Sequence, residues 1–225
     1  YKTGSEVQTG SQHIENTAFN DLGDVTDRKI TSYFGSTTTL IDYRHEKDIL
    51  YNPQHQAVSL ISYAYADNTE ADGVLLDVTR TLNSGFDAGT GVVNLITQIS
   101  YNKKMVMIGV KTIKNEDIKS NGSVGKVTVT NFKTASVDAV TGAITVAASD
   151  SLYQDVITNV SFDDYGNATL EKIVTKNYKS GSFSEFSSAR KIENTFDVYN
   201  RMMTSTVTGY TDETWTDSSR SGIQR

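Results

Sequence analysis

The sequence predicts an all-β fold in which tandem β-hairpins form an extended or spiralling antiparallel sheet, as part of a shell, a barrel or a solenoid. Three observations predict it. Ser and Thr make up almost a quarter of the 225 residues and there are 12 Tyr and 8 Phe, and Thr, Tyr and Phe favour a pleated, half-buried surface. A short motif of an aromatic residue followed by Asp or Asn recurs along the chain. No segment keeps a 3.6-residue apolar period over three turns, so helices are not expected.

The motif is clearest in Ser161–Ile173 and Thr195–Val207, where an aromatic and an aspartate precede a turn-like tetrapeptide. Its aromatic position is occupied by Phe19, Tyr51, Phe86, Phe162 and Phe196. The intervals are 32, 35, 76 and 34 residues, and 76 is about two repeats. We interpret Ser136–Thr145 as a worn copy in the long interval, with Val137 replacing the aromatic. Periods of 20 to 50 residues indicate an array of supersecondary units.

The predicted organisation is one array over residues 1–225. Its approximate units are 13–48, 49–83, 84–120, 121–158, 159–190 and 191–225.

Each copy is predicted to be a hairpin. The aromatic ends a strand on its buried side, and the Asp or Asn after it accepts backbone N–H bonds that start a turn. The Gly four residues after the aromatic supplies the positive φ of a type I turn with a bulge, and Asn200 and His55 occupy that position in two copies. The flanks alternate as strands should, with Val93, Leu95, Ile99 and Tyr101 on one face. The structural motif residues are Phe19, Asn20, Gly23, Tyr51, Asn52, Phe86, Asp87, Phe162, Asp163, Gly166, Asn167, Phe196, Asp197 and Asn200.

The run Phe162–Thr169, aromatic-Asp-x-x-Gly-Asn-x-Thr, resembles the YD repeat of bacterial Rhs proteins, toxin-complex shell subunits and teneurins. In that family, hairpins follow one another in a long spiral that often walls a hollow shell. The resemblance implies a structural segment of a larger secreted or cell-surface bacterial protein. Its partners would be neighbouring repeats of the same or an identical chain. The spacing here is longer than in the compact repeat, and the only proline, Pro53, gives no Asp-Pro self-cleavage segment.

Composition excludes several classes of function. The net charge is −6 and no run of Lys and Arg stands out, so nucleic acid is not an expected partner. The chain has no cysteine, hence no disulfide framework and no thiolate metal site, and no cofactor is expected. No stretch approaches the roughly 20 apolar residues that span a bilayer. The chain begins at Tyr1 without an initiator Met or a signal peptide, which we interpret as a processed product or part of something longer.

The most charged stretch, Ile41–Leu50, offers a catalytic alternative. A hydrolase would use His45 with Asp42 or Glu46 as an acid/base couple. No nucleophile motif accompanies these residues, and an exposed ladder of alternating charges on a strand is the simpler interpretation. The three histidines, His13, His45 and His55, lie in separate repeats without the spacing of a zinc site. We therefore expect a protein that is not an enzyme.

Two binding hypotheses stay open. Asn68, Glu70 and Asp72 fall at the first, third and fifth places of an EF-hand-like loop, but Thr79 stands where that loop needs a bidentate Glu, so a calcium site here would be weak. Trp215, Tyr63 and Tyr65 could stack on sugar rings, which makes a carbohydrate-binding adhesin module the main alternative to a structural role. For Tyr63 and Tyr65, which share one face of a strand, burial explains the residues as simply as binding does.

Overall fold

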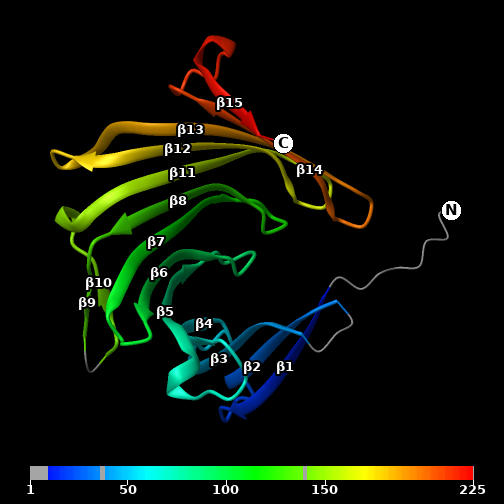
Figure 1. Cartoon of the computed structure of the whole chain (residues 1–225), viewed down its shortest axis with the longest axis vertical. Coiled ribbons are helices and arrows are strands. Elements are labelled where there is room, and N and C mark those ends of the chain that lie inside the picture. The colour runs from blue at the N-terminus through cyan, green and yellow to red at the C-terminus, as the bar shows by residue number, and fades with distance from the viewer. Residues whose placement is uncertain (1–9, 36–38, 139–140, 225) are drawn as a thin grey trace. The chain divides into compact units, whose positions relative to one another are not determined.

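The computed structural model describes residues 10–35, 39–138 and 141–224 and is all-β, as the sequence predicts. The start of the chain at Tyr1 lies outside the described residues. Within them, one antiparallel sheet contains thirteen strands in the order β1-β2-β3-β4-β5-β6-β7-β8-β11-β12-β13-β14-β15 (Figure 1). Each strand lies beside the next strand of the chain, apart from β9 and β10, which form a separate two-stranded sheet. The prediction of tandem hairpins is therefore confirmed.

The strands are β1 (Gly10–Phe19), β2 (Val25–Phe34), β3 (Leu40–Tyr51), β4 (Ala57–Tyr65), β5 (Leu75–Phe86), β6 (Val93–Asn102), β7 (Met107–Ile118), β8 (Val124–Phe132), β9 (Ser136–Val137), β10 (Ile144–Thr145), β11 (Ser151–Phe162), β12 (Ala168–Lys179), β13 (Ser182–Phe196), β14 (Met202–Tyr210) and β15 (Arg220–Gln224). Three single 3₁₀ turns, Asp72–Val74, Ala148–Asp150 and Asp217–Ser219, precede β5, β11 and β15. Among the described residues, no helix has the length and apolar character needed to cross a membrane.

The chain divides into two compact units, and β5, β6 and β7 contribute to both. The first unit comprises the described residues up to Leu82 together with Gln98–Ile108. The second comprises Asn83–Thr97 and the described residues from Gly109 onward. In the first unit Val78 and Ile99 are the largest fully buried side chains, and Tyr43 and Ile49 are also buried. The buried apolar side chains of the second unit are Val110, Phe132, Ile173, Ala189 and Tyr210.

The turn between β11 and β12 has the predicted type I geometry with a bulge. The N–H of Gly166 donates to the carbonyl of Asp163 at 3.1 Å, and the N–H of Asp163 donates to that of Asn167 at 3.0 Å. One carboxylate oxygen of Asp163 accepts the backbone N–H groups of Tyr165 and Asn167, at 3.0 and 2.9 Å. Gly166 has a φ of 86°, in the left-handed region that glycine adopts without steric cost.

The same bonds recur in the turns that begin at Asn20, Asn52 and Asp197. Gly23, His55 and Asn200 take the left-handed position there, with φ of 87°, 60° and 65°. The expectation that each motif aromatic is buried fails for Phe19, which is 58% exposed, and the other four, Tyr51, Phe86, Phe162 and Phe196, are only half-buried. Phe19 lies on β1, which has one neighbouring strand among the described residues, so fewer side chains can cover it.

Two turns in the 76-residue interval, at Asn102 and at Lys119, have the backbone bonds of the Asp163 turn. The turn at Asn102 follows an aromatic, Tyr101, and the side-chain oxygen of Asn102 accepts the N–H groups of Lys104 and Val106 at 2.9 and 3.1 Å. The N–H of Gly122 donates to the carbonyl of Lys119 at 2.9 Å and Gly122 has a φ of 85°, so this turn joins β7 to β8 in the same way. Sequence comparison missed the Lys119 turn because Ile118 replaces the aromatic and Lys119 the acidic residue.

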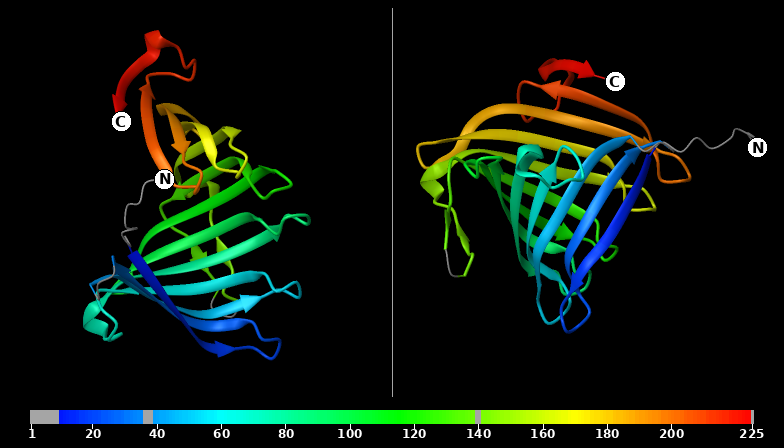
Figure 2. Two further views of the ribbon diagram at one scale, coloured as in Figure 1. Left: turned by 90° about the vertical axis from the view of Figure 1, so that its right-hand side faces the viewer. Right: turned by 60° about the horizontal axis from the view of Figure 1, so that its bottom comes forward.

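The Ser136 stretch forms the β9–β10 hairpin, which projects from the neighbouring strands (Figures 1 and 2). Its turn has the bonds of the Phe86 copy: the N–H of Gly142 donates to the carbonyl of Asp138 at 2.9 Å, as that of Gly91 does to Asp87 at 2.8 Å.

Successive tight turns contact one another within each unit. In the first unit the imidazole of His55 lies 2.8 Å from a carboxylate oxygen of Asp24. In the second, the hydroxyl of Ser123 donates to the carbonyl of Gly166 at 3.1 Å, and the side-chain amide of Asn167 donates to the side-chain oxygen of Asn200. The turns therefore bond to the next hairpin as well as closing their own.

Candidate functional site

Two longer connections share one conformation, and each covers strands of its own unit. The acidic loop, Ala66–Val74, joins β4 to β5, and the tryptophan loop, Thr211–Ser219, joins β14 to β15. In each, the first N–H donates to the last carbonyl, at 2.8 and 2.7 Å, and a 3₁₀ turn closes the loop. Each folds back over strands that precede it, as the contacts below show.

The interior of both loops follows the pattern Asp-x-Thr-x. Asp67 accepts the backbone N–H of Thr69 at 2.9 Å, and Asp212 accepts that of Thr214 at 2.8 Å. The next residue has a positive φ in both, 56° at Glu70 and 61° at Trp215. This left-handed residue is the one that each loop places over the sheet.

In the first unit, Glu70 lies over β2 and β3. Its Oε1 accepts the hydroxyl of Tyr43 at 2.6 Å and lies 2.8 Å from Nζ of Lys29. Its Oε2 lies 2.7 Å from Nδ1 of His45. The other ring nitrogen of His45 lies 2.7 Å from Oδ1 of Asp27, which also accepts the hydroxyl of Thr17. We call Asp27, Lys29, Tyr43, His45 and Glu70 the charged cluster.

Several hydrogen-bond donors converge on Glu70 in the charged cluster. His45 faces a carboxylate oxygen with each ring nitrogen, and carboxylates only accept hydrogen bonds. Burial raises the pKa of Glu70, but hydrogen bonds from Lys29, Tyr43 and His45 outweigh it and lower the pKa to about 2.

The pKa values of two further residues of the cluster, Asp27 and Tyr43, are also shifted. For Asp27, burial again opposes the shift, while hydrogen bonds from Thr17 and His45 lower the pKa of the carboxyl. Burial raises the pKa of Tyr43, and its hydrogen bond to Glu70 adds to the effect. The charged cluster thus holds the acidic loop against β2 and β3 through hydrogen bonds to the carboxylate of Glu70, which are stronger when that carboxylate is ionised.

The catalytic trio considered from sequence does not converge. Side chains alternate along β3, so Asp42 and Glu46 lie on the face opposite His45. Asp42 pairs with Arg44 at 2.8 Å, and Glu46 pairs with Arg28 at 2.6 Å. The partners of His45 come from β2 and from a loop 25 residues further along, and the side chain is only 7% exposed. His45 therefore has the surroundings of a structural group.

The weak calcium site expected at Asn68, Glu70 and Asp72 does not assemble. Both carboxylate oxygens of Glu70 are engaged in the charged cluster. Nowhere in the described part of the chain do three His, Asp or Glu side chains gather closely enough to hold a metal ion.

In the second unit, Trp215 lies over β12 and β14. Its ring contacts Tyr210 edge-on at a centroid distance of 5.2 Å, and Nζ of Lys172 lies 5.1 Å from the indole centroid. Glu213 of the same loop pairs with Lys176 at 2.7 Å. The tryptophan loop thereby forms one wall of a groove of about 490 Å³. The lining residues are Gln154, Val156, Thr158, Val160, Lys172, Val174, Lys176, Phe183, Glu213 and Trp215.

Tyr63 and Tyr65, the other aromatics considered for sugar binding, pack within the first unit. Their rings stack at 6.5 Å, and Tyr65 contacts Tyr43 at 6.0 Å. Lys47 lies over the ring of Tyr63 at 5.6 Å. All three aromatics are half-buried, and Trp215 is the one that lines the groove.

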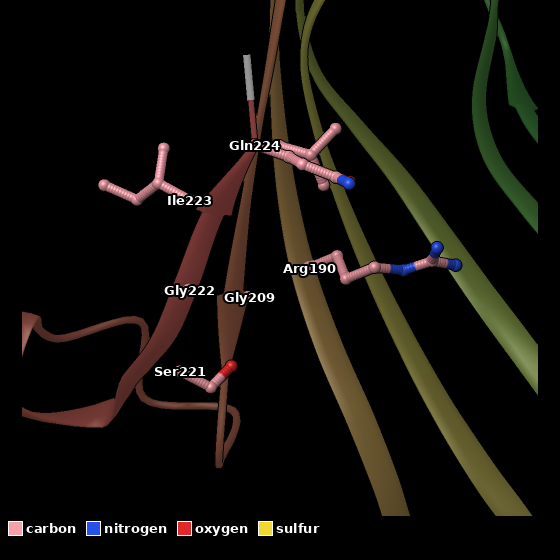
Figure 3. A pocket seen from close by; sticks show the side chains of 7 residues that line it. Arg190, Gly209, Ser221, Gly222, Ile223 and Gln224 are labelled. Atoms are coloured by element: carbon pink, nitrogen blue, oxygen red, sulfur yellow. The ribbon is translucent and has the colours of Figure 1, made fainter.

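A smaller hollow of about 280 Å³ lies over β13, β14 and β15 (Figure 3). Arg190, Gly209 and Gly222 stand opposite one another across these strands, and the two glycines leave the space beside Arg190 empty. Ile223 points away from the side chains of Arg190 and Gln224 (Figure 3). The hollow is explained by missing side chains.

Sequence reasoning missed a set of asparagines that join adjacent strands. The side-chain amides of Asn115, Asn159 and Asn194 donate to the carbonyls of Val93, Val124 and Ala168, at 2.8, 2.7 and 3.2 Å. In each case the acceptor is the first or second residue after a tight turn, where the ladder is interrupted. The signal was present as an Asn two or three residues before the last residue of the strand.

Comparison of the chain with family models, with characterised proteins and with solved structures found no match.

Proposed function

We propose that the chain is a structural segment of a larger secreted or cell-surface bacterial protein, in which its hairpins build a wall or a filament. One observation carries the proposal. The same tight turn joins β1 to β2, β3 to β4, β7 to β8, β11 to β12 and β13 to β14, and within each unit it bonds to the turn of a neighbouring one of these hairpins.

In this role, hydrogen bonds between neighbouring strands would extend the sheet from one hairpin to the next. Backbone ladders join each strand to the next, and the asparagine amides add a side-chain bond across neighbouring strands. In a repeat array, each unit is stabilised chiefly by the units beside it. Long antiparallel ladders with bonded turns resist separation along the whole length of a strand.

The compartment and the larger parent protein rest on the resemblance to YD repeats. A chain without cysteine suits a bacterial exported protein that does without disulfides. Within the described residues, β1 and β15 have one neighbouring strand each, and such strand edges favour pairing with further hairpins of the same or an identical chain.

Hydrogen exchange tests the array. The intact chain is compared with a chain ending at Gly181, which lacks β13, β14 and β15. We expect faster amide exchange in β12, a smaller effect in β11 and none in β1 to β4. Unchanged exchange in β12 would show that hairpins are independent and would contradict the proposal.

The parent protein is tested by the mass of the native polypeptide that carries this sequence, with an antibody raised against the chain. We expect a product far larger than 225 residues, present outside the cytoplasm. A cytoplasmic product of about this size would refute the proposed wall segment.

A further inference from the structure

We propose that the groove under the tryptophan loop binds a carbohydrate that carries a carboxylate. This ligand site lies within the second unit and is a function separate from the structural role. Its floor comes from β11 and β12, and its walls come from the start of β13 and from the tryptophan loop. A volume of about 490 Å³ accommodates a short oligosaccharide.

The indole of Trp215 is held in place before any ligand arrives. The Asp212–Thr214 bond fixes the loop, and the edge of the Trp215 ring is fixed by Tyr210. The ion pair of Glu213 with Lys176 anchors the loop to β12. Because little ordering remains to be done on binding, a rigid aromatic surface of this kind favours affinity.

Lys172 supplies the charge. Its ammonium lies against the indole, and within the described residues no carboxylate stands at ion-pair distance from it. Neighbouring lysines of this unit differ: Lys176 pairs with Glu213 at 2.7 Å and Lys191 with Glu193 at 3.0 Å. A cation on the wall of a groove without a protein counter-ion favours an anionic ligand.

The first unit contains an equivalent lysine, Lys29, that is paired with a carboxylate. Lys29 is the fifth residue after its tight turn, as Lys172 is after its own. The loop two strands further on covers each of them with its left-handed residue. In the first unit that residue is Glu70, whose carboxylate bonds Lys29 at 2.8 Å. In the second it is Trp215, which leaves the carboxylate to be supplied by a ligand.

The rest of the groove suits a sugar better than an acidic peptide. Gln154 and Thr158 alternate with Val156 and Val160 along β11, so hydrogen-bonding groups and apolar surface lie side by side. A pyranose ring carries hydroxyls at its rim and C–H groups on its faces, which match that alternation and the indole. Extended peptides instead add to an exposed sheet edge, whereas this groove lies on the face of central strands.

The experiment uses the intact chain and its single tryptophan. Trigalacturonate is titrated while the fluorescence of Trp215 and the heat of binding are followed, with maltotriose as a neutral trisaccharide. We expect a saturable signal with trigalacturonate and at least tenfold weaker binding of maltotriose. Lys172→Gln should weaken trigalacturonate binding at least tenfold, and Trp215→Ala should do the same by calorimetry.

Lys104→Gln is the matched control, since it removes one positive charge from an exposed turn. It should leave affinity within twofold, and circular dichroism should show that all three variants fold. The proposal is overturned by no binding at 10 mM trigalacturonate, by equal binding of maltotriose or by equal affinity in Lys172→Gln. It is also overturned if acetate displaces trigalacturonate at equal carboxylate concentration, or if a glutamate-rich peptide binds more tightly.

Discussion

Replacing Glu70 with Gln removes the charge at the centre of the charged cluster and keeps the size of the side chain. The side chain is 20% exposed, so solvent screens it only in part. Its pKa falls from 4.5 to about 2 on folding. At 1.36 kcal/mol per pKa unit, the ionised form is favoured by about 3 kcal/mol over the neutral form. Glu70→Gln should lower the free energy of unfolding at pH 7 by an amount of that order.

The effect has a defined pH range. Because the pKa of Glu70 is lower in the folded than in the unfolded chain, its stabilisation is complete above about pH 4.5 and is lost as the pH falls towards 2. The difference between wild type and Glu70→Gln should therefore shrink through this range and vanish near pH 2. Other carboxylates also titrate there, but they do so in both proteins and cancel in the difference.

Urea unfolding followed by circular dichroism at several pH values measures this difference. Hydrogen exchange in β2 and β3 localises it to the first unit. Glu185→Gln is the control, since Glu185 pairs with Lys179 on an exposed surface and its loss should change stability far less. A difference below about 1 kcal/mol at pH 7, or one that does not vary with pH, would refute our account of the charged cluster.

Three further substitutions test the fold. Gly166→Ala should lower the free energy of unfolding by about 1 to 2 kcal/mol from the positive φ alone, and by more because its new Cβ would lie 2.7 Å from Oγ of Ser123. Gly23→Ala has open space around the new Cβ and should show only the effect of the positive φ; urea unfolding measures both. Asn194→Ala removes a buried side-chain amide that donates to the neighbouring strand, and it should lower the free energy of unfolding by about 1 to 3 kcal/mol with faster amide exchange in β12. A cost below about 0.5 kcal/mol, the effect of an ordinary surface substitution, would argue against the role of the asparagines. Ile99→Ala empties a fully buried site and should cost about 2 to 5 kcal/mol by the same assay, unless the site collapses around the cavity.

The fold class could be predicted because its signals are local. Strand alternation and the turn motif at Asp163 and Asp197 each concern a few adjacent residues, and the structure forms the turns with the expected bonds. The turn at Lys119 escaped detection because backbone geometry, and not the aromatic, defines it. A Gly in the left-handed position is sufficient there.

The candidate sites could not be predicted in the same way. Alternation alone already separates His45 from Asp42 and Glu46, so that part of the catalytic hypothesis could have been rejected from sequence. The actual partners of His45 are Asp27 and Glu70, which lie 18 and 25 residues away. Their approach depends on sheet register and on the path of a loop, neither of which a motif encodes. The sequence indicates Trp215 as a candidate for stacking on a sugar ring, whereas Lys172 becomes a candidate only because the register places it beside the indole.

The two covering loops show how a repeat scaffold can carry different chemistry at equivalent positions. Their Asp-x-Thr turns are fixed by local hydrogen bonds, so the left-handed residue is delivered to the sheet whatever its side chain is. The turn itself therefore does not depend on the side chain at that position. Glu70 pairs with Lys29 from this position, whereas beside Trp215 no carboxylate of the described residues stands at ion-pair distance from Lys172. The proposed structural array and the proposed binding groove are thus compatible in one chain, because the ladders and tight turns stabilise the strands while the loops determine what lies on their face.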